Sequence, residues 1–153
     1  MKELVEAKVT YRFKASAERV FDAWLDPTMV RSWLSMPSPL LGVMDVRTVE
    51  IDPRVGGRFT FSDMREAGEA VHWGFYREID RPRRLVFTWF TSPEEEETND
   101  SVVTLTIEPT DDGCVATIVH SMDAQWAEYI KQTENGWHSL LSQVDSFLTQ
   151  QHA

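Results

Sequence analysis

The last long segment of the chain, from Asp123 to about Gln150, constrains the fold most, because it predicts one unusually long helix. Its apolar residues recur at every third or fourth position, as on one face of an amphipathic helix. Asp123 is suited to cap the first turn, since a short carboxylate accepts from free backbone amides. A helix of this length reaches about 40 Å, the width of a small domain, so it must lie across the rest of the fold. The apolar stripe consists of Trp126, Tyr129, Ile130, Thr133, Trp137, Leu140, Leu141, Val144, Phe147 and Leu148.

Gly136 interrupts this stripe. A glycine in a helix interior costs about 1 kcal/mol relative to alanine. The sequence therefore predicts that another backbone or a ligand approaches closely at Gly136, or that the helix bends there.

The chain before this helix predicts one strand, two short helices and six further strands. Residues 5–13 alternate between apolar and polar side chains, which is typical of a strand with one buried face. The first short helix begins after Ser16, and the second has Asp26 as its cap and Pro27 at its first position. A proline-containing loop follows from Ser35 to Gly42. The six later strands are predicted near 43–52, 58–64, 70–79, 84–91, 102–109 and 114–121.

This order of elements predicts an α+β fold in a single domain that covers residues 1–153. Strands joined by short turns form an antiparallel meander. A seven-stranded antiparallel sheet needs a cover on one face only, and the long helix is the one predicted element large enough to provide it. We therefore expect the sheet to curl around the C-terminal helix, with the two short helices closing one end.

Composition excludes several classes of protein. The net charge of −10 argues against nucleic acid as a partner, because a phosphate backbone would be repelled over most of the surface. The single cysteine excludes a disulfide framework. No apolar run reaches the length of a membrane span, and the first residues lack the apolar core of a signal peptide. These features predict a cytoplasmic protein that is a monomer or a weak homodimer.

Short motifs along nearly the whole chain resemble, in order, those of one known family. They are Phe13–Ala15, Val20–Trp24, Asp26–Pro27, Trp33, Asp52–Gly57, Gly74–Ile79, Pro82, Leu85–Trp89, Ser101–Thr104, Asn135–Trp137, Leu140 and Leu141. The family is the domain related to the Hsp90 ATPase activator, within the helix-grip superfamily of START domains, birch-pollen allergens and polyketide cyclases. The resemblance implies a helix-grip fold with a deep cavity between the sheet and the long helix, and it names no catalytic residue.

Ring-containing residues are the strongest sign of a site. Three pairs at spacing i, i+2 each place two rings on one face of a strand, and tryptophans from the predicted helices should face the same space. An ordinary filled core would use the same rings, whereas an open cavity would suit a hydrophobic or aromatic small molecule. The predicted cavity wall consists of Trp33, Phe59, Phe61, Trp73, Phe75, Phe87, Trp89, His120, Trp126, Ile130, Trp137 and Leu141.

Two polar residues are candidates for the interior of this cavity. His120 shares the parity of Cys114, so it reaches the cavity if that face of its strand is turned toward the long helix. The alternative is a histidine at a strand end that is solvated or bonded to backbone. Arg47 would place a cation in the pocket, unless a bulge or a strand end turns it to solvent. His138 lies beside the apolar stripe and is expected at the surface.

Two further expectations concern the strand region. Glu78 shares a face with Gly74 and Tyr76, which indicates that this face is the outer one and that Trp73 and Phe75 face inward. The acidic run at residues 94–97 lies in the longest predicted loop, and it is expected to be a solvated tip.

Three classes of function remain open. The preferred hypothesis is a binding module without cofactor or metal, since the histidines are far apart and none pairs with Cys114 at zinc-site spacing. The second is a cyclase, dehydratase or hydrolase acting on a polyketide-like substrate. It would need His120, Arg47 or a tyrosine with a shifted pKa in the cavity. The third is a chaperone partner, placed last because the outward-facing sets of residues look solvated.

Overall fold

The computed structural model describes residues 3–38 and 42–150, and within them the predicted α+β architecture is confirmed. Seven strands form one antiparallel sheet in the order β1-β7-β6-β5-β4-β3-β2. The strands are β1 (Leu4–Phe13), β2 (Asp45–Ile51), β3 (Arg58–Arg65), β4 (Gly68–Asp80), β5 (Arg84–Thr88), β6 (Val102–Thr110) and β7 (Gly113–Asp123). The predicted loop at Ser35–Gly42 falls partly outside the described residues, because Pro39 and its two successors are among those not described.

The six strands from β2 to β7 follow one another as a meander, and β1 joins the sheet beside β7. The β1–β7 ladder runs without interruption from the pair Leu4–Asp123 to the pair Phe13–Cys114. The first strand of the chain is therefore hydrogen-bonded to the last strand, at one edge of the sheet.

Both short helices begin where their capping residues predict. Helix α1 (Ala17–Leu25) has Ser16 at its N-cap, and the Ser16 side chain accepts a hydrogen bond from the Arg19 amide. Helix α2 (Pro27–Leu34) follows at once, with Asp26 accepting from two first-turn amides. The two helices bury Phe21, Trp24 and Trp33, among other residues.

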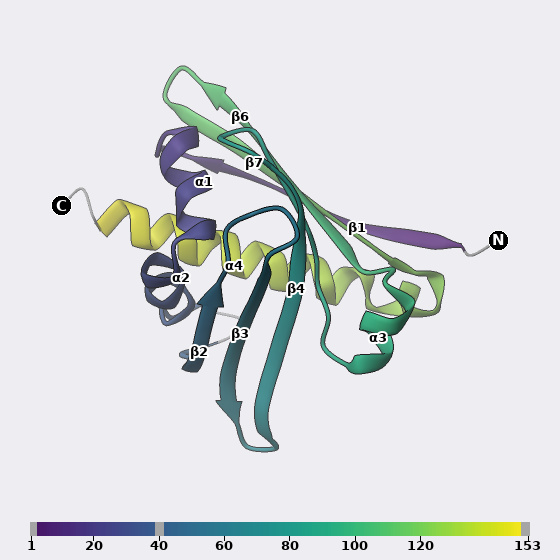
Figure 1. Cartoon of the computed structure of the whole chain (residues 1–153). Helices are drawn as coiled ribbons and strands as arrows, with labels where there is room; N and C mark the ends of the chain where they lie inside the picture. Colours follow the sequence, from purple (N-terminus) through teal and green to yellow (C-terminus); the bar gives the residue numbers. More distant parts are fainter. Residues whose placement is uncertain (1–2, 39–41, 151–153) are drawn as a thin grey trace.

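The C-terminal helical segment consists of a 3₁₀ turn, η1 (Ala124–Tyr129), and the helix α4 (Ile130–Gln150). Asp123 caps it as predicted, because its carboxylate accepts from the Gln125 amide at 2.9 Å. The segment lies along β1 and reaches α1 and α2 with its C-terminal part, crossing the molecule from the side of α3 (Pro93–Thr98) to the side of α1 (Figure 1). Leu141 and Val144 are fully buried in the core that this helix completes.

Side-chain contacts fasten α4 to the first two elements of the chain. The Tyr11 hydroxyl of β1 donates to Asp145 Oδ2 at 2.7 Å. Burial and this carboxylate raise the pKa of Tyr11 to about 12, so the hydroxyl stays a donor at neutral pH. The Arg19 guanidinium of α1 donates to the Leu148 carbonyl at 3.1 Å. The helix is thus held at its C-terminal half by both the sheet and α1.

The acidic run at residues 94–97 is helical and does not form the loop that was predicted. Helix α3 (Pro93–Thr98) has Ser92 at its N-cap and three glutamates in its first turn, where negative charge is favoured by the helix dipole. It ends at Asn99, which takes the left-handed conformation with φ 58°. Most of this run is exposed as expected, but Glu95 is half-buried.

Candidate functional site

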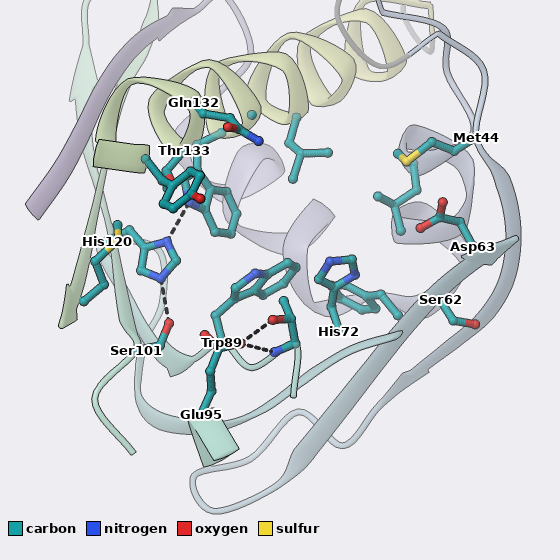
Figure 2. A pocket seen from close by; sticks show the side chains of 18 of the residues that line it. Met44, Ser62, Asp63, His72, Trp89, Glu95, Ser101, His120, Gln132 and Thr133 are labelled. Atoms are coloured by element: carbon teal, nitrogen blue, oxygen red, sulfur yellow. Dashed lines mark hydrogen bonds between the residues drawn. The ribbon is translucent and has the colours of Figure 1, made fainter. Parts of the chain in front are cut away.

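A cavity of about 490 Å³ lies between the inner face of the sheet and the C-terminal helical segment. The lining residues come from β2, β3, β4 and β7, from the segments just after β5 and just before β6, from α1, α2 and α3, and from the helical segment (Figure 2). Volumes of this order are typical of sites for small molecules. The residues that line it include Trp24, Trp33, Leu34, Met44, Val46, Phe61, Ser62, Asp63, Arg65, His72, Trp89, Thr91, Glu95, Ser101, His120, Met122, Trp126 and Trp137.

One face of the C-terminal segment forms the cavity's helical wall. Tyr129, Gln132, Thr133, Gly136, Trp137 and Leu140 all line the cavity. They follow the spacing i, i+3, i+4, i+7, i+8 and i+11, which places them on one stripe of a helix. Gly136 is central in this stripe, so any side chain at that position would project into the cavity.

Of the three alternatives predicted for Gly136, the close approach of another backbone is wrong. A Cβ atom placed on Gly136 meets no other atom within 4 Å. The glycine leaves open space in the middle of the helical wall, and the cavity occupies that space.

Trp89 is the centre of the aromatic wall. Its ring lies 5.1 Å from the Trp137 ring and 5.0 Å from the His72 ring, measured between centroids. The ring centroids of Phe59, Phe61 and Phe87 lie 5.9–6.4 Å from that of Trp89. Such offset and edge-to-face pairs hold one another in place, so the wall is formed before any ligand enters.

Ten of the twelve predicted wall residues divide into three groups. Trp33, Phe61, Trp89, His120, Trp126 and Trp137 line the cavity. Phe59 and Phe87 pack behind the lining, and Leu141 is fully buried in the core beside it. Ile130 is half-buried and does not line the cavity.

The placement of Trp73 and Phe75 inside the cavity is wrong. Both rings lie on the opposite face of the sheet, where the Arg58 guanidinium stands 5.8 Å and 5.9 Å from their centroids. The Trp73 indole also donates to Glu96 of α3. These contacts form an outer cluster that has no part in the cavity.

A β-bulge explains this inversion. Tyr76 is paired with Phe87, but Glu78 is paired with the next residue, Val86, so one residue is inserted between the two pairs. The alternation of faces therefore shifts by one, and an exposed Glu78 coexists with a buried Tyr76. Position 74 is a glycine because Phe59 and the Thr88 backbone leave no space there for a Cβ atom.

His120 enters the cavity and is held there by two hydrogen bonds. The Trp137 indole N–H donates to His120 Nδ1 at 3.0 Å, and His120 Nε2 lies 2.7 Å from Ser101 Oγ (Figure 2). Because an indole nitrogen can only donate, Nδ1 must be the unprotonated acceptor. Nε2 then carries the proton of the neutral ring and donates it to Ser101.

Burial keeps His120 neutral. The side chain is 7% exposed, and desolvation lowers its pKa from 6.5 to about 4. At neutral pH the ring therefore stays in the tautomer that Trp137 selects. The alternative of a solvated histidine at a strand end is excluded by this position.

A second polar group lies on the other side of Trp89 (Figure 2). His72 stacks on Trp89. Burial is the main cause that lowers the pKa of His72, and the positive charge of Arg65 lowers it further, whereas the charges of Asp63 and Glu95 act in the opposite direction. Asp63 accepts two hydrogen bonds from Arg65, at 2.8 Å and 3.2 Å. The cavity thus has an aromatic centre between two polar ends.

Two other candidates lie outside the cavity. Arg47 is exposed at an irregularity of β2, between the residues paired with Asp63 and Ser62, and its guanidinium bonds Asp45. The expectation that a bulge would turn it to solvent is confirmed. His138 is exposed, as predicted, and its ring lies 5.5 Å from that of Tyr11.

Sequence reasoning missed Ser101, His72 and Asp63. Ser101 precedes β6, lines the cavity, and accepts a hydrogen bond from the Trp89 amide with its carbonyl. His72 lies two residues before Gly74 and therefore on the same face of its strand. A glycine inside a strand is a sign of close packing, so Gly74 was the available signal that this face, with His72, points inward. Among residues 3–38 and 42–150, no three His, Cys, Asp or Glu side chains gather in an arrangement that holds a metal ion.

A comparison with models of known protein families identifies a family for this chain. A model of the family "Activator of Hsp90 ATPase homolog 1-like protein" matches residues 14–149. The chain belongs to this family. A search of curated proteins finds no match. Within the described residues, no helix carries an apolar stretch long enough to cross a membrane.

Solved structures of other proteins share the fold. An AHSA1-like protein from Aeromonas hydrophila is 20% identical, with a TM-score of 0.74 over 97% of this chain and 94% of that one. A protein of unknown function from Staphylococcus aureus is 16% identical, with a TM-score of 0.81 over 99% and 97%. A protein from Mycobacterium smegmatis is 24% identical, with a TM-score of 0.75 over 96% and 92%. At these identities the likeness concerns the fold, here the helix-grip arrangement of the Hsp90-activator-like family.

Proposed function

We propose that this chain binds a small, apolar, ring-containing molecule in the cavity and makes or breaks no bond in it. The observation that carries the proposal is a space of about 490 Å³ walled by the rings of Trp33, Phe61, Trp89, Trp126 and Trp137. Aromatic walls offer a large apolar contact area at low entropic cost, because each ring has few rotatable bonds. The rings of Trp89 and Trp137 also support each other, so little ordering is required on binding.

The state of His120 argues against the enzyme alternative. In a serine–histidine pair that activates a nucleophile, the histidine offers a lone pair to the serine hydroxyl. Here the Trp137 indole occupies Nδ1, and the Nε2 proton is directed at Ser101. Arg47, another candidate for such chemistry, is exposed outside the cavity. The same residues serve well as fixed polar contacts in a binding site.

The test uses N-phenyl-1-naphthylamine, a neutral probe whose fluorescence rises in apolar surroundings. We expect saturable binding to the native chain, with quenching of tryptophan emission as the probe enters. Gly136→Phe should abolish binding, because the new ring projects into the cavity from the centre of the helical wall. Asn135→Phe is the matched control, since the neighbouring Asn135 is exposed and does not line the cavity.

The expected result is loss of binding in Gly136→Phe only, with the melting temperatures of both variants near that of the native chain. Absence of a signal with the native chain, or equal binding by Gly136→Phe, contradicts the proposal. In that case a protein partner, as the family's name suggests for its founding member, becomes the first hypothesis to test.

A further inference from the structure

The hydrogen-bond chain at one end of the cavity has a direction, and Ser101 is its last member. Trp137 donates to His120, and His120 donates to Ser101 Oγ. The Ser101 hydroxyl therefore acts as an acceptor toward His120, and its own proton is not used in that bond. Among the residues that the structure describes, this hydroxyl has no hydrogen-bond partner other than His120.

Burial makes this unused proton significant. Ser101 is 7% exposed and lines the cavity. Buried donors are nearly always satisfied in native proteins, and an unsatisfied one lowers stability or binding. We infer that the Ser101 hydroxyl donates a hydrogen bond to an acceptor oxygen on the ligand, so that the ligand is a ring compound with a carbonyl at one end. This inference rests on the proposed function, because it specifies a contact inside the same cavity.

The charges around the cavity favour a neutral carbonyl over a carboxylate. Arg65 lines the cavity but is paired with Asp63 at 2.8 Å. Glu95 adds a further negative charge to the lining, and its contacts are with the Thr91 amide and hydroxyl. His120 is neutral because burial lowers its pKa. An anionic ligand would therefore be desolvated without gaining an opposite charge.

The first test measures the direction of the chain in the protein without ligand. Long-range ¹⁵N–¹H correlation spectra distinguish the protonated from the unprotonated ring nitrogen of each histidine. At neutral pH we expect His120 to carry its proton on Nε2, and His120→Gln identifies the signal. A proton on Nδ1, or on both nitrogens, would overturn the inference whatever the cavity binds.

The second test compares two probes of the same planar shape. 2-Acetylnaphthalene has a carbonyl where 2-isopropenylnaphthalene has a carbon–carbon double bond, so only the first can accept a hydrogen bond. Their dissociation constants are measured by tryptophan quenching with the native chain, Ser101→Ala and Ser101→Thr. We expect Ser101→Ala to weaken the ketone about 3- to 10-fold and to leave the alkene within a factor of about 2.

Ser101→Thr retains the hydroxyl and should retain the preference for the ketone. If both probes bind but Ser101→Ala changes them equally, Ser101 contributes shape alone and the inference fails while the proposed function stands. If neither probe binds the native chain, the proposed function fails, and the specificity inferred from it fails too. The spectra then report separately whether the tautomer was assigned correctly.

Discussion

The C-terminal helical segment has two halves that share one apolar pattern and differ in what covers it. From Trp137 onward most apolar side chains are buried against β1, α1 and α2, with Leu141 and Val144 at 0% exposure, and only Trp137 and Leu140 of this half also line the cavity. From Ala124 to Gly136 no residue is buried, and Trp126 and Tyr129 are 41% and 43% exposed. The same helical periodicity therefore serves as a core contact in one half and as a cavity wall in the other.

This difference shows how one helix supports both folding and a site. The C-terminal half is fastened by the buried side chain of Gln143, which donates to the carbonyls of Trp33, Leu34 and Met36 at the end of α2. The other half has no such contact with the short helices. Stability should therefore depend on the C-terminal half, and ligand binding on the half from Ala124 to Gly136.

The largest expected contrast is between two tryptophans. Trp137→Ala should lower the free energy of unfolding by about 3–5 kcal/mol, because it removes a buried ring at the junction of the two halves. Trp126→Ala should change it by about 0.5 kcal/mol, as an exposed position does. Urea denaturation followed by circular dichroism measures both. Equal losses would mean that the half from Ala124 to Gly136, which contains Trp126, is also part of the core.

Two glutamines on the same helix give the next contrast. Gln143→Leu should lower the free energy of unfolding by about 2–3 kcal/mol, because the carbonyls of Leu34 and Met36 lose their donor in a buried place. Gln132→Leu is the control, since Gln132 is exposed at the cavity and should change stability by about 0.5 kcal/mol. A neutral outcome for Gln143→Leu would show that the glutamine does not fasten α2.

A pH effect is expected where the two halves meet, at the bond between Trp137 and His120. The pKa of His120 is about 4 in the folded chain and near 6.5 when unfolded. The unfolded chain thus binds the extra proton first, so stability is complete above pH 6.5 and is lost as the pH falls toward 4. One pKa unit corresponds to about 1.4 kcal/mol, so roughly 2 kcal/mol should be lost between pH 6.5 and 5.

Urea denaturation at pH 6.5 and pH 5 measures this loss. His120→Gln should show a smaller one, with His72 contributing in the same direction because its pKa is also lowered by burial. An unchanged pH dependence in His120→Gln would mean that His120 is protonated or exposed in the folded chain.

The smallest effect should come from Gly136, in the half that lines the cavity. Gly136→Ala should raise the free energy of unfolding by about 0.5–1 kcal/mol, because alanine favours the helix and the new methyl group meets open space. Gly74→Ala is the contrasting change, since its Cβ would collide with the Thr88 backbone and should destabilise the sheet. Thermal unfolding compares the two, and a loss of stability in Gly136→Ala would point to a filled space behind this glycine.

Local physical chemistry made most elements of this fold predictable from the sequence. Ser16, Asp26 and Asp123 cap their helices because a short side chain can reach the amides of its own first turn. Alternation along residues 5–13 identified β1, and the apolar stripe identified α4, because these periods belong to the backbone itself. Such rules act within a few residues and need no knowledge of the rest of the chain.

The tertiary structure alone decided which faces meet. A single bulge between Tyr76 and Glu78 reversed the face that was assigned to Trp73 and Phe75, because the alternation of polar and apolar residues does not reveal an inserted residue. The pairing of β1 with β7 joins the first strand of the chain to the last one. It places His120 opposite Ala7, with the His120 side chain toward α4. Ser101, His120 and Trp137 come from three separate segments, so their hydrogen-bond chain exists only where sheet and helix meet. Distances between segments far apart in the sequence are set by packing, and packing is a property of the whole chain.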